Sequence, residues 1–226
     1  SACVLTKMTL NGSIIWSKVY DGVYIDWIEG ICTLPDGSIA AVGFTSSFGL
    51  NTFSIHDGLA MRFDANGNIL WINAYGSTDN EWLTHIFTTP DGGLMAIGAT
   101  SGWNGGTGGT YQDDGWMIKL DIGGDLQWSK VIQSDQNIDF GIQGVTTSAD
   151  GGYVMAANDV SNISDNVPLY FKTDANGVIE WSKVYNNTGL GRLYSVDRSG
   201  DGYVLAGYVS DGAQADAWLL RCDAAG

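Results

Sequence analysis

Two segments of the chain carry side chains that are suited to binding a sugar. They are 46–57 and 101–114, and the second reads SGWNGGTGGTYQDD. An aromatic ring can cover the apolar face of a pyranose while carboxylates accept hydrogen bonds from its hydroxyl groups. The candidate ligand-binding residues are therefore Phe48, His56, Trp103, Tyr111, Asp113 and Asp114. A long surface loop in which Trp103 folds back over its own sheet is an equally good interpretation.

Three aspartates recur just before the same kind of β-rich run, namely Asp57, Asp114 and Asp216. A ring of carboxylates could bind Ca²⁺, because this cation prefers several oxygen ligands. The interpretation that we favour is that each Asp accepts hydrogen bonds from the amides of its own loop. The sequence indicates no other cofactor.

No set of catalytic residues stands out in the sequence. A hydrolase needs a nucleophile, a base and a group that orients the base, whereas His56 and His85 are isolated in the chain. The 25 acidic residues offer many chance pairs of carboxylates for glycoside cleavage, and nothing singles out one pair. We therefore expect that the protein is not an enzyme.

These candidate residues lie between the elements of an internal repeat. Each repeat has a basic residue, then a Gly turn, then a Trp, as in Lys7, Gly12 and Trp16. The recurring tryptophans are 55, 57 and 53 residues apart, and they are Trp16, Trp71, Trp128 and Trp181. One supersecondary unit per period is typical of stacked or radial repeat architectures. The recurring basic residues are expected to pair with nearby acids.

Each repeat has four short β-rich runs joined by turn sequences. In the last complete repeat the runs are 169–173, 178–185, 193–197 and 203–209. The last of these runs carries small residues such as Ala206 and Gly207, which suit a crowded position, for example near a central axis. No segment has a sustained helical period. We therefore predict an all-β fold, a β-propeller built from four-stranded blades.

The recurrence of Trp favours a propeller over two ordinary β-sandwich domains, the alternative that the length allows. A large side chain at a fixed place on each blade can wedge against the next blade, and truncating a buried Trp to Ala costs about 3–5 kcal/mol. The four tryptophans of the repeat are therefore assigned a structural role. The single domain is predicted to span 1–226, with repeats at approximately 2–56, 57–113, 114–166 and 167–215 and a partial repeat at 216–226.

The number of runs does not make whole blades. If each blade starts at the small-residue run, the chain supplies three complete blades, a front fragment at about 2–34 and a tail at about 202–223. The first strand of the tail can complete the front fragment and close a four-bladed ring, which leaves the run 216–223 over. That run could cover the place where the two ends of the ring join, pair with another copy of the chain, or begin a further blade. A fragment of a larger propeller and self-association through the terminal strands both remain open.

The three cysteines, Cys3, Cys32 and Cys222, form no metal-binding motif. Cys3 and Cys222 lie on equivalent runs at the two ends of the chain, so a disulfide that closes a ring is conceivable. Their side chains fall on opposite faces of the aligned runs, which favours free thiols instead.

The charge and composition are typical of a secreted or surface-displayed protein. The net charge is −15, and only 10 residues are Lys or Arg, so nucleic acid and anionic membranes are not expected partners. No stretch of about 18 apolar residues is present, and we expect no membrane insertion. The chain shows no signal peptide, starts at Ser1 inside one repeat and ends inside another. A processed chain, or a piece of a longer protein, is therefore expected.

Two sequence segments of the repeat resemble the repeats of a known group of proteins. The phrases FDANGNILW at 63–71 and FKTDANGVIEWSKVY at 171–185 are similar to the repeats of secreted bacterial and archaeal β-propeller proteins, the delta-60 and SBBP-type repeats. In that group a run such as DGYVLAGY, here at 201–208, precedes one such as DAWLLR, here at 216–221. The resemblance covers nearly the whole chain. It implies an extracellular propeller that is often one module of a large cell-surface protein, and it implies no established activity.

A weaker similarity is to the tryptophan-docking repeats of quinoprotein dehydrogenase propellers and of the outer-membrane assembly lipoprotein that shares their fold. Those repeats also place Asp-Ala-x-x-Gly a few residues before a Trp. The chain has no vicinal cysteine pair and no Glu-Asn-Asp cluster that could surround a quinone and calcium. These departures argue against a quinone enzyme.

The sequence therefore predicts a noncatalytic binding or assembly module, extracellular or on a cell surface. Its partner is expected to be a carbohydrate or a cell-surface protein, recognised by loops at one face of the propeller. The alternative is a structural subunit of a larger surface assembly or filament joined by strand pairing. A third candidate is a quinoprotein-like or glycan-active enzyme.

Overall fold

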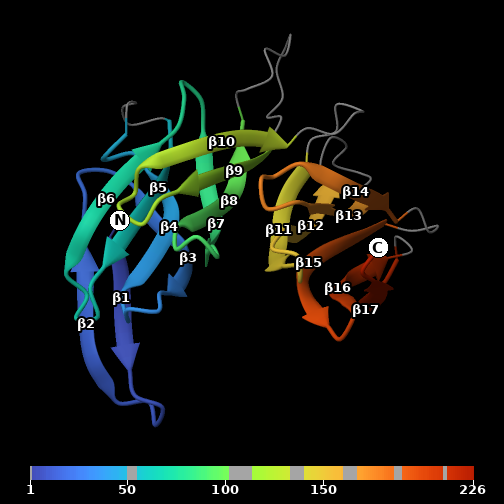
Figure 1. The fold of residues 1–226 in the computed structure, drawn as a ribbon, viewed down its shortest axis with the longest axis horizontal. Coiled ribbons are helices and arrows are strands. Elements are labelled where there is room, and N and C mark those ends of the chain that lie inside the picture. The colour runs from blue at the N-terminus through green and yellow to red at the C-terminus, as the bar shows by residue number, and fades with distance from the viewer. Residues whose placement is uncertain are drawn as a thin grey trace. The chain divides into compact units, whose positions relative to one another are not determined.

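The computed structural model describes residues 2–49, 55–101, 114–132, 140–159, 167–185, 190–210 and 213–226. These residues form 17 β-strands and no helix. Figure 1 labels the strands in chain order. In the same residues there is accordingly no helix long and apolar enough to span a membrane. The predicted all-β fold is confirmed.

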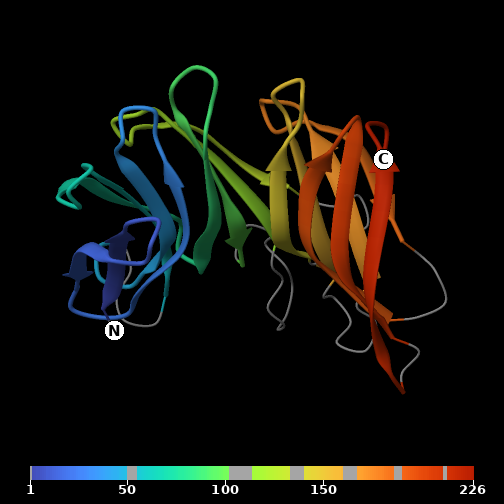
Figure 2. The same ribbon diagram turned by 90° about the horizontal axis from the view of Figure 1, so that it is seen from below.

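The strands form five sheets, and each sheet holds strands that follow one another in the chain (Figure 2). The first sheet is a hairpin of β1 (Cys3–Met8) and β2 (Ile14–Tyr20). The second sheet holds β3 (Asp26–Thr33), β4 (Ile39–Thr45), β5 (Asp57–Phe63) and β6 (Ile69–Tyr75). The third sheet holds β7 (Glu81–Thr88), β8 (Leu94–Thr100), β9 (Asp114–Leu120) and β10 (Leu126–Ile132).

The fourth sheet is again four-stranded, and the fifth has three strands among the described residues. The fourth holds β11 (Phe140–Thr147), β12 (Tyr153–Asp159), β13 (Val167–Thr173) and β14 (Ile179–Val184). The fifth holds β15 (Leu190–Ser199), β16 (Gly202–Ser210) and β17 (Ala215–Asp223).

Each complete sheet begins one strand earlier than the predicted blades do. The predicted front fragment at about 2–34 is not a sheet, because β3 pairs with β4 and not with β1 or β2. The reason is the short turn between β3 and β4, which brings these consecutive strands together as a hairpin. The small-residue strands β4, β8, β12 and β16 are thus the second strand of their sheets.

The chain forms two compact units. The first comprises Ser1–Gly109 and Trp116–Val131, and the second comprises Thr110–Gly115 and Ile132–Gly226. The core of the first unit includes two clusters of buried residues. One lies between the second and third sheets and includes Ala40, Val42, Leu83, Ile86 and Trp116. The other lies between the first hairpin and the second sheet and includes Leu5, Leu59, Met61 and Phe63.

The small-residue strands β4 and β8 need a glycine at the position that faces a bulge on the adjacent first strand. The pairing of β3 with β4 shifts between Ile28 and Gly30, and that of β7 with β8 shifts in the same way. At each bulge a carbonyl oxygen points at the facing glycine, so a Cβ atom on Gly43 would collide with the oxygen of Trp27. This contact explains Gly43, because the crowded position that the sequence predicts for these strands is created here by a carbonyl oxygen of the adjacent strand.

Neighbouring first strands lie close together at another glycine. A Cβ atom added to Gly30 on β3 would lie 2.5 Å from the carbonyl oxygen of Thr84 on β7. In the second unit, Gly144 on β11 faces the backbone of Ser195 on β15 in the same way, at 2.7 Å from its Cα. The first strands are therefore where successive sheets of one unit meet.

Three of the repeated tryptophans lie against the turn glycine of the next sheet. Trp16 lies against Gly67, Trp71 against Gly124, and Trp181 against Gly226. Each of these glycines has a positive φ, and a Cβ atom there would lie about 3 Å from the indole ring. The indole Nε1 atoms of Trp16 and Trp71 also donate hydrogen bonds to turn carbonyl oxygens, those of Ala65 at 3.3 Å and Ile122 at 3.1 Å.

In the second unit a buried amide joins the fourth and fifth sheets. The side-chain Nδ2 of Asn158 on β12 donates to the carbonyl oxygen of Leu193 on β15 at 2.8 Å, and its Oδ1 accepts from the Leu193 amide at 2.7 Å. This reciprocal pair satisfies two backbone groups at the bulge of β15, where they would otherwise be buried without partners. The side chain of Leu193 belongs to one core cluster with Val154, Ala156 and Leu205.

The basic residue of the third strand pairs with an aspartate in the turn between the first and second strands of its own sheet. The pairs are Arg62 with Asp36 at 2.6 Å, Lys119 with Asp91 at 3.0 Å, and Lys172 with Asp150 at 2.7 Å. The cationic side chains are largely buried whereas the carboxylates are exposed. All three cysteine thiols are free.

Candidate functional site

The first hairpin is held against the second sheet by polar contacts to a single turn. The Nζ atom of Lys7 donates to the carbonyl oxygen of Ala65 at 3.1 Å. The Tyr20 hydroxyl donates to the carbonyl oxygen of Gly67 at 2.6 Å, and its ring packs on Phe63 at a centroid distance of 4.7 Å. Lys7 lies near the turn of the hairpin, whereas Tyr20 pairs with Cys3 at its open end. A cleft lies between this open end and the second sheet.

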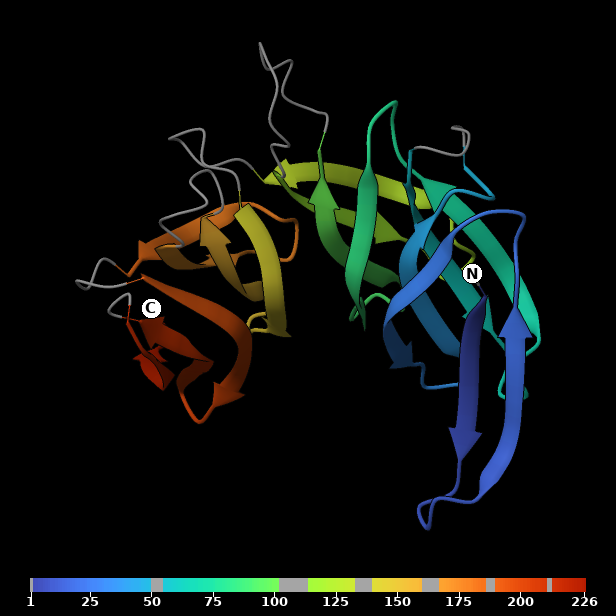
Figure 3. The ribbon, with the colours of Figure 1, turned by 180° about the vertical axis from the view of Figure 1, so that it is seen from behind.

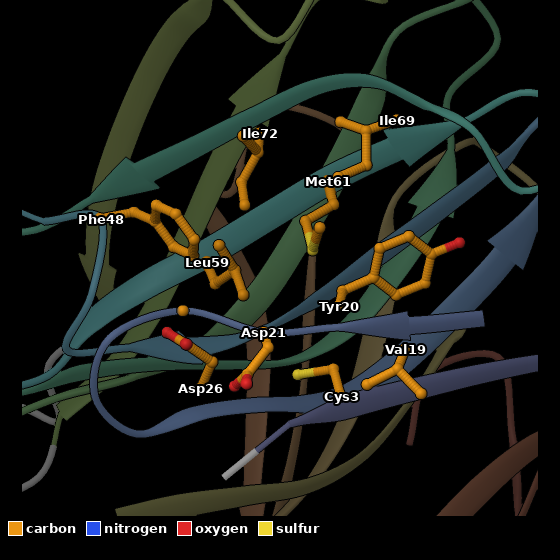
Figure 4. A pocket seen from close by; sticks show the side chains of 11 residues that line it. Cys3, Val19, Tyr20, Asp21, Asp26, Phe48, Leu59, Met61, Ile69 and Ile72 are labelled. Carbon is orange, nitrogen blue, oxygen red and sulfur yellow. The ribbon is translucent and has the colours of Figure 1, made fainter.

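The cleft has a volume of about 240 Å³ and an apolar floor. Leu59 and Met61 of β5 and Ile69 and Ile72 of β6 form the floor, as Figure 4 shows. The facing wall comes from the first hairpin and is made by Cys3, Val19 and Tyr20. Strand alternation accounts for the floor, because Leu59 and Met61 are two residues apart and share one face of β5.

Polar groups gather at one end of the cleft. Asp21 and Asp26 line that end together with the ring of Phe48, whereas the hydroxyl of Tyr20 points towards the opposite end (Figure 4). The chain reaches this end because β2 stops at Tyr20 and the next five residues lead to β3. A carboxylate pair and an aromatic ring therefore stand above an aliphatic floor.

Hydrogen bonds fix the position of Asp26. Its Oδ1 accepts from the hydroxyl of Thr45 at 2.5 Å, and its Oδ2 accepts from the hydroxyl of Ser47 at 2.8 Å. The position across the cleft end has to be a glycine, because a side chain at Gly22 would collide with both Asp26 and Ser47. Asp21 is exposed, and is the carboxylate that can adjust to a ligand.

The thiol of Cys3 lies in the same cleft. Its pKa is raised by burial and then by the negative charge of Asp26. A thiol is nucleophilic only as the thiolate, so Cys3 stays protonated and unreactive at neutral pH. Its role in the cleft is that of a small apolar group.

A row of acidic and hydroxyl side chains lies at the rim of the second and third sheets. In the second sheet Thr45, at the end of β4, faces Asp26 on one side and Asp57 on the other. In the third sheet Thr100, at the end of β8, faces Glu81, and β9 begins with Asp114. All four acids are buried, and of these only Asp26 also lines the cleft. Asp57, Glu81 and Asp114 therefore serve the packing of the sheet ends and not the cleft.

Asp57 and Glu81 belong to neighbouring sheets and lie against the same backbone position. A Cβ atom on Gly76 would collide with both carboxylates. The pKa of Glu81 is raised by burial, and the charge of Asp57 raises it further. Hydrogen bonds from the Ser77 amide at 3.0 Å and the Thr100 hydroxyl at 3.1 Å oppose the rise.

His56 links two loops through its backbone. Its amide donates to Oδ1 of Asn80 at 2.9 Å, and its carbonyl oxygen accepts from the amide of Glu81 at 2.7 Å. The ring packs on Phe44 at a centroid distance of 4.8 Å, and its Nδ1 lies 2.7 Å from the hydroxyl of Ser46. His56 does not line the cleft.

The structure places the candidate residues of the sequence analysis in different environments. Phe48 lines the cleft and is half exposed, whereas Asp114 is buried at the rim. Trp103, Tyr111 and Asp113 lie outside the described residues. The three aspartates proposed for calcium lie on three different third strands. Asp57 and Asp114 are the first residues of β5 and β9, Asp216 is the second residue of β17, and Asp216 is exposed while Asp57 is buried. Among the described residues no three His, Cys, Asp or Glu side chains lie together so as to hold a metal ion.

Sequence reasoning missed Asp21, Asp26 and Glu81. A signal for two of them is present, because Asp26-Trp27 and Glu81-Trp82 are acid-Trp pairs at the same place of the repeat. The cleft itself has no local signal, since its wall and floor come from segments about 40 to 70 residues apart.

No protein-family model matches the chain, and no curated protein matches it in sequence. Among solved structures it is similar to a xylan beta-1,4-xylosidase from Bacillus halodurans C-125, with a TM-score of 0.50 and 9% identity over 96% of this chain and 50% of that chain. It is also similar to a mutant of Trypanosoma rangeli sialidase displaying trans-sialidase activity, with a TM-score of 0.50, 10% identity, and coverage of 95% of this chain and 40% of that chain. The sialidase in complex with sialic acid gives a TM-score of 0.50 at 8% identity, over 96% of this chain and 38% of that one.

These likenesses show the fold, which is of the β-propeller type. The chain spans half or less of the length of each of these structures. They also correct one expectation, that the protein is not an enzyme. That expectation rested on the absence of a recognisable catalytic trio, but the proteins that share this fold at 8–10% identity are glycoside-cleaving enzymes by name. A lack of sequence motifs on this fold is therefore no argument against catalysis.

Proposed function

We propose that the protein is a carbohydrate-binding module of an extracellular or cell-surface protein, and that its ligand occupies the cleft under the first hairpin. The observation that carries the proposal is the combination of Phe48, Asp21 and Asp26 above an aliphatic floor. A pyranose has an apolar face and a rim of hydroxyl groups, and this arrangement offers a partner for each.

The size of the cleft limits the ligand. Its volume of about 240 Å³ is below the roughly 300–1,000 Å³ typical of pockets for drug-sized molecules. One sugar ring, at the end of a longer glycan, is therefore the unit that the cleft would hold. Asp26 is already held by two hydroxyl donors, so Asp21 is the carboxylate left to bind a sugar hydroxyl.

The extracellular setting rests on the resemblance of the repeats to those of secreted propeller proteins and on the strong negative charge. The acidic surface favours neutral or cationic ligands over sulfated or sialylated glycans. Neutral hexoses and pentoses are accordingly the first ligands to test.

A second candidate function is cleavage of a glycosidic bond. Two carboxylates at one end of a sugar-sized cleft are the minimum that such a reaction needs, one as acid and one as nucleophile or base. This candidate differs from pure binding in a single measurement, the release of reducing sugar from a bound glycan.

A glycan array followed by calorimetry with the best ligand tests the proposal. Asp21→Asn and Phe48→Ala should each weaken binding at least tenfold, because each removes one of the groups above the floor. The control is Tyr194→Ala, which removes a half-exposed aromatic ring from the other unit and should leave binding unchanged. Absence of binding to any glycan, or equal affinities for all four proteins, would overturn the proposal.

A further inference from the structure

The strand β1 has an open edge. In complete sheets the third strand lies between two neighbours, as β5 lies between β4 and β6. β1 is the counterpart of β5, because Lys7 faces Trp16 as Arg62 faces Trp71. Within the described part of the chain, however, β1 pairs only with β2. Its other edge presents unpaired backbone groups, which can template the addition of a strand.

Apolar side chains surround this edge. A groove of about 630 Å³ is lined by residues of β1 and β3, the strands seen together in Figure 3. Val4, Trp27 and Ile31 lie in the groove, and 55–60% of the surface of each is exposed. Exposed apolar residues that are contiguous with an open strand edge are typical of an interface.

The complete sheets show what kind of segment fits there. In each complete sheet the third strand pairs with the small-residue strand, which itself forms a hairpin with the first strand. The turn of this hairpin carries an aspartate that pairs with the basic residue of the third strand. Lys7 is the basic residue of β1, and it forms no ion pair within the described residues, where its Nζ donates to a carbonyl oxygen instead. The missing occupant is therefore a hairpin with an aspartate in its turn.

The β15–β16 hairpin has these properties. Its turn carries Asp201, which pairs with Arg221 of β17 at 3.5 Å, and the two side chains are 90% and 68% exposed. Val204 and Ala206 of β16 occupy the positions of Ala40 and Val42 on β4, but they are half-buried where the residues of β4 are fully buried. β17 is itself mostly exposed, unlike β5 or β9.

We infer that the chain self-associates by strand exchange, with the β1–β2 hairpin of one copy replacing β17 on β16 of a second copy. The result is a four-stranded sheet of β15 and β16 from one copy and β1 and β2 from the other. The six residues of β1 replace part of the pairing that the nine residues of β17 make with β16. The gain is the burial of Ile31 against Val204 and Ala206, and an aspartate partner for Lys7 in Asp201.

The register of β16 with β17 predicts the contacts of the new sheet. Arg221 faces Val204, and Leu220 faces Leu205. Since Lys7 takes the place of Arg221, Lys7 should face Val204 and Thr6 should face Leu205. The contact joins different surfaces of the two copies, so it can close in a reciprocal dimer or continue head to tail.

The first experiment is a measurement of molar mass by light scattering from low micromolar to submillimolar concentration. For the unaltered protein the expected result is a mass of two or more chains that falls to the mass of one chain on dilution. The Ile31→Asp variant is expected to have the mass of one chain at every concentration. The matched control is Val178→Asp, which changes a side chain of similar exposure in the other unit and should associate like the unaltered protein. Far-ultraviolet circular dichroism of both variants shows whether each is folded. A single-chain mass at every concentration would overturn the inference.

The second experiment tests the register. One chain carries Thr6→Cys and another carries Leu205→Cys, both with Cys3, Cys32 and Cys222 replaced by Ala. Oxidation of the mixture should give a disulfide-linked heterodimer, whereas Ser17→Cys on β2, in place of Thr6→Cys, should not. A chain that carries both new cysteines and forms the disulfide only within itself, at single-chain mass, would assign the edge to its own hairpin and contradict exchange between copies.

Discussion

Ile31 and Ile86 occupy equivalent positions on the first strands of successive sheets, yet Ile31 is 59% exposed and Ile86 is 4% exposed. Each faces an alanine of the small-residue strand, Ala41 or Ala96, three residues after the start of a bulge. The difference lies in the preceding sheet. Ile86 packs on the four-stranded second sheet, whereas the sheet before Ile31 consists, among the described residues, of β1 and β2. The neighbouring sheet, and not the strand's own sequence, decides whether a first strand is buried.

The largest expected effect is a difference in stability between two identical substitutions. Ile86→Ala should lower the free energy of unfolding by about 2–5 kcal/mol, because it leaves a cavity in the core. Ile31→Ala should change it by no more than about 0.5 kcal/mol when the chain is monomeric, because water already reaches the side chain. Denaturation in urea at low protein concentration measures both values. Equal losses would show that Ile31 is buried in solution.

The bulge glycines should not share this difference. Gly43 on β4 and Gly98 on β8 each face a carbonyl oxygen of the adjacent strand, and this contact does not depend on a neighbouring sheet. Gly43→Ala and Gly98→Ala should therefore each cost about 1–3 kcal/mol. Gly123→Ala is the control, because the nearest atom to an added Cβ would be the side-chain oxygen of Asp121 at 3.2 Å. A much smaller loss for Gly43→Ala than for Gly98→Ala would contradict a purely local cause.

The repeat could be predicted because its signals are local. Turn glycines, the alternation of apolar residues and the spacing of Trp16 and its counterparts each act over a few residues, and they suffice for strands and for the fold class. The grouping into sheets was harder. A small residue such as Gly43 predicts a crowded position but not its cause, which is a carbonyl oxygen at a bulge on the adjacent strand of the same sheet.

The cleft could not be predicted from the sequence. Its wall at Cys3 and its floor at Leu59 meet only because the first hairpin docks on the turn at Gly67. Asp26 looked like one acid among 25, and its place at the cleft depends on Thr45 and Ser47, which hold its carboxylate. Sites of this kind depend on tertiary contacts, and residue type alone does not single them out.

The ion pairs of complete and incomplete sheets provide a weaker contrast. Asp150 pairs with the largely buried Lys172, whereas Asp201 pairs with the exposed Arg221. Asp150→Asn should lower the free energy of unfolding by about 1–2 kcal/mol, because a buried cation loses a charged hydrogen-bond partner. Asp201→Asn should change it by no more than about 0.5 kcal/mol, as is usual for exposed pairs. If the two variants lose equal stability in urea, burial of the cation does not set the strength of the pair.

The smallest expected effects concern pH, and they have opposite signs at the turns and at the rim. Hydrogen bonds from Thr89 and Lys119 lower the pKa of Asp91 to about 2. Its contribution to stability is therefore present above its unfolded pKa and is lost as the pH falls from about 4 towards 2. Burial raises the pKa of Glu81, so its folded form favours the proton and stability is lost as the pH rises through that pKa.

Glu81→Gln removes the titrating group at the rim and keeps most of its shape. Relative to the unaltered protein, this variant should become more stable as the pH rises from about 4 to about 8, because only the unaltered protein must then hold a buried charge next to Asp57. Asp91→Asn should instead become relatively less stable as the pH rises from about 2 to about 5. Urea denaturation at several pH values measures both trends. A stability difference for Glu81→Gln that does not change with pH would contradict this expectation. It would mean that water reaches Glu81, so that the contact between the second and third sheets is as open to water there as the exposed face of β3 is.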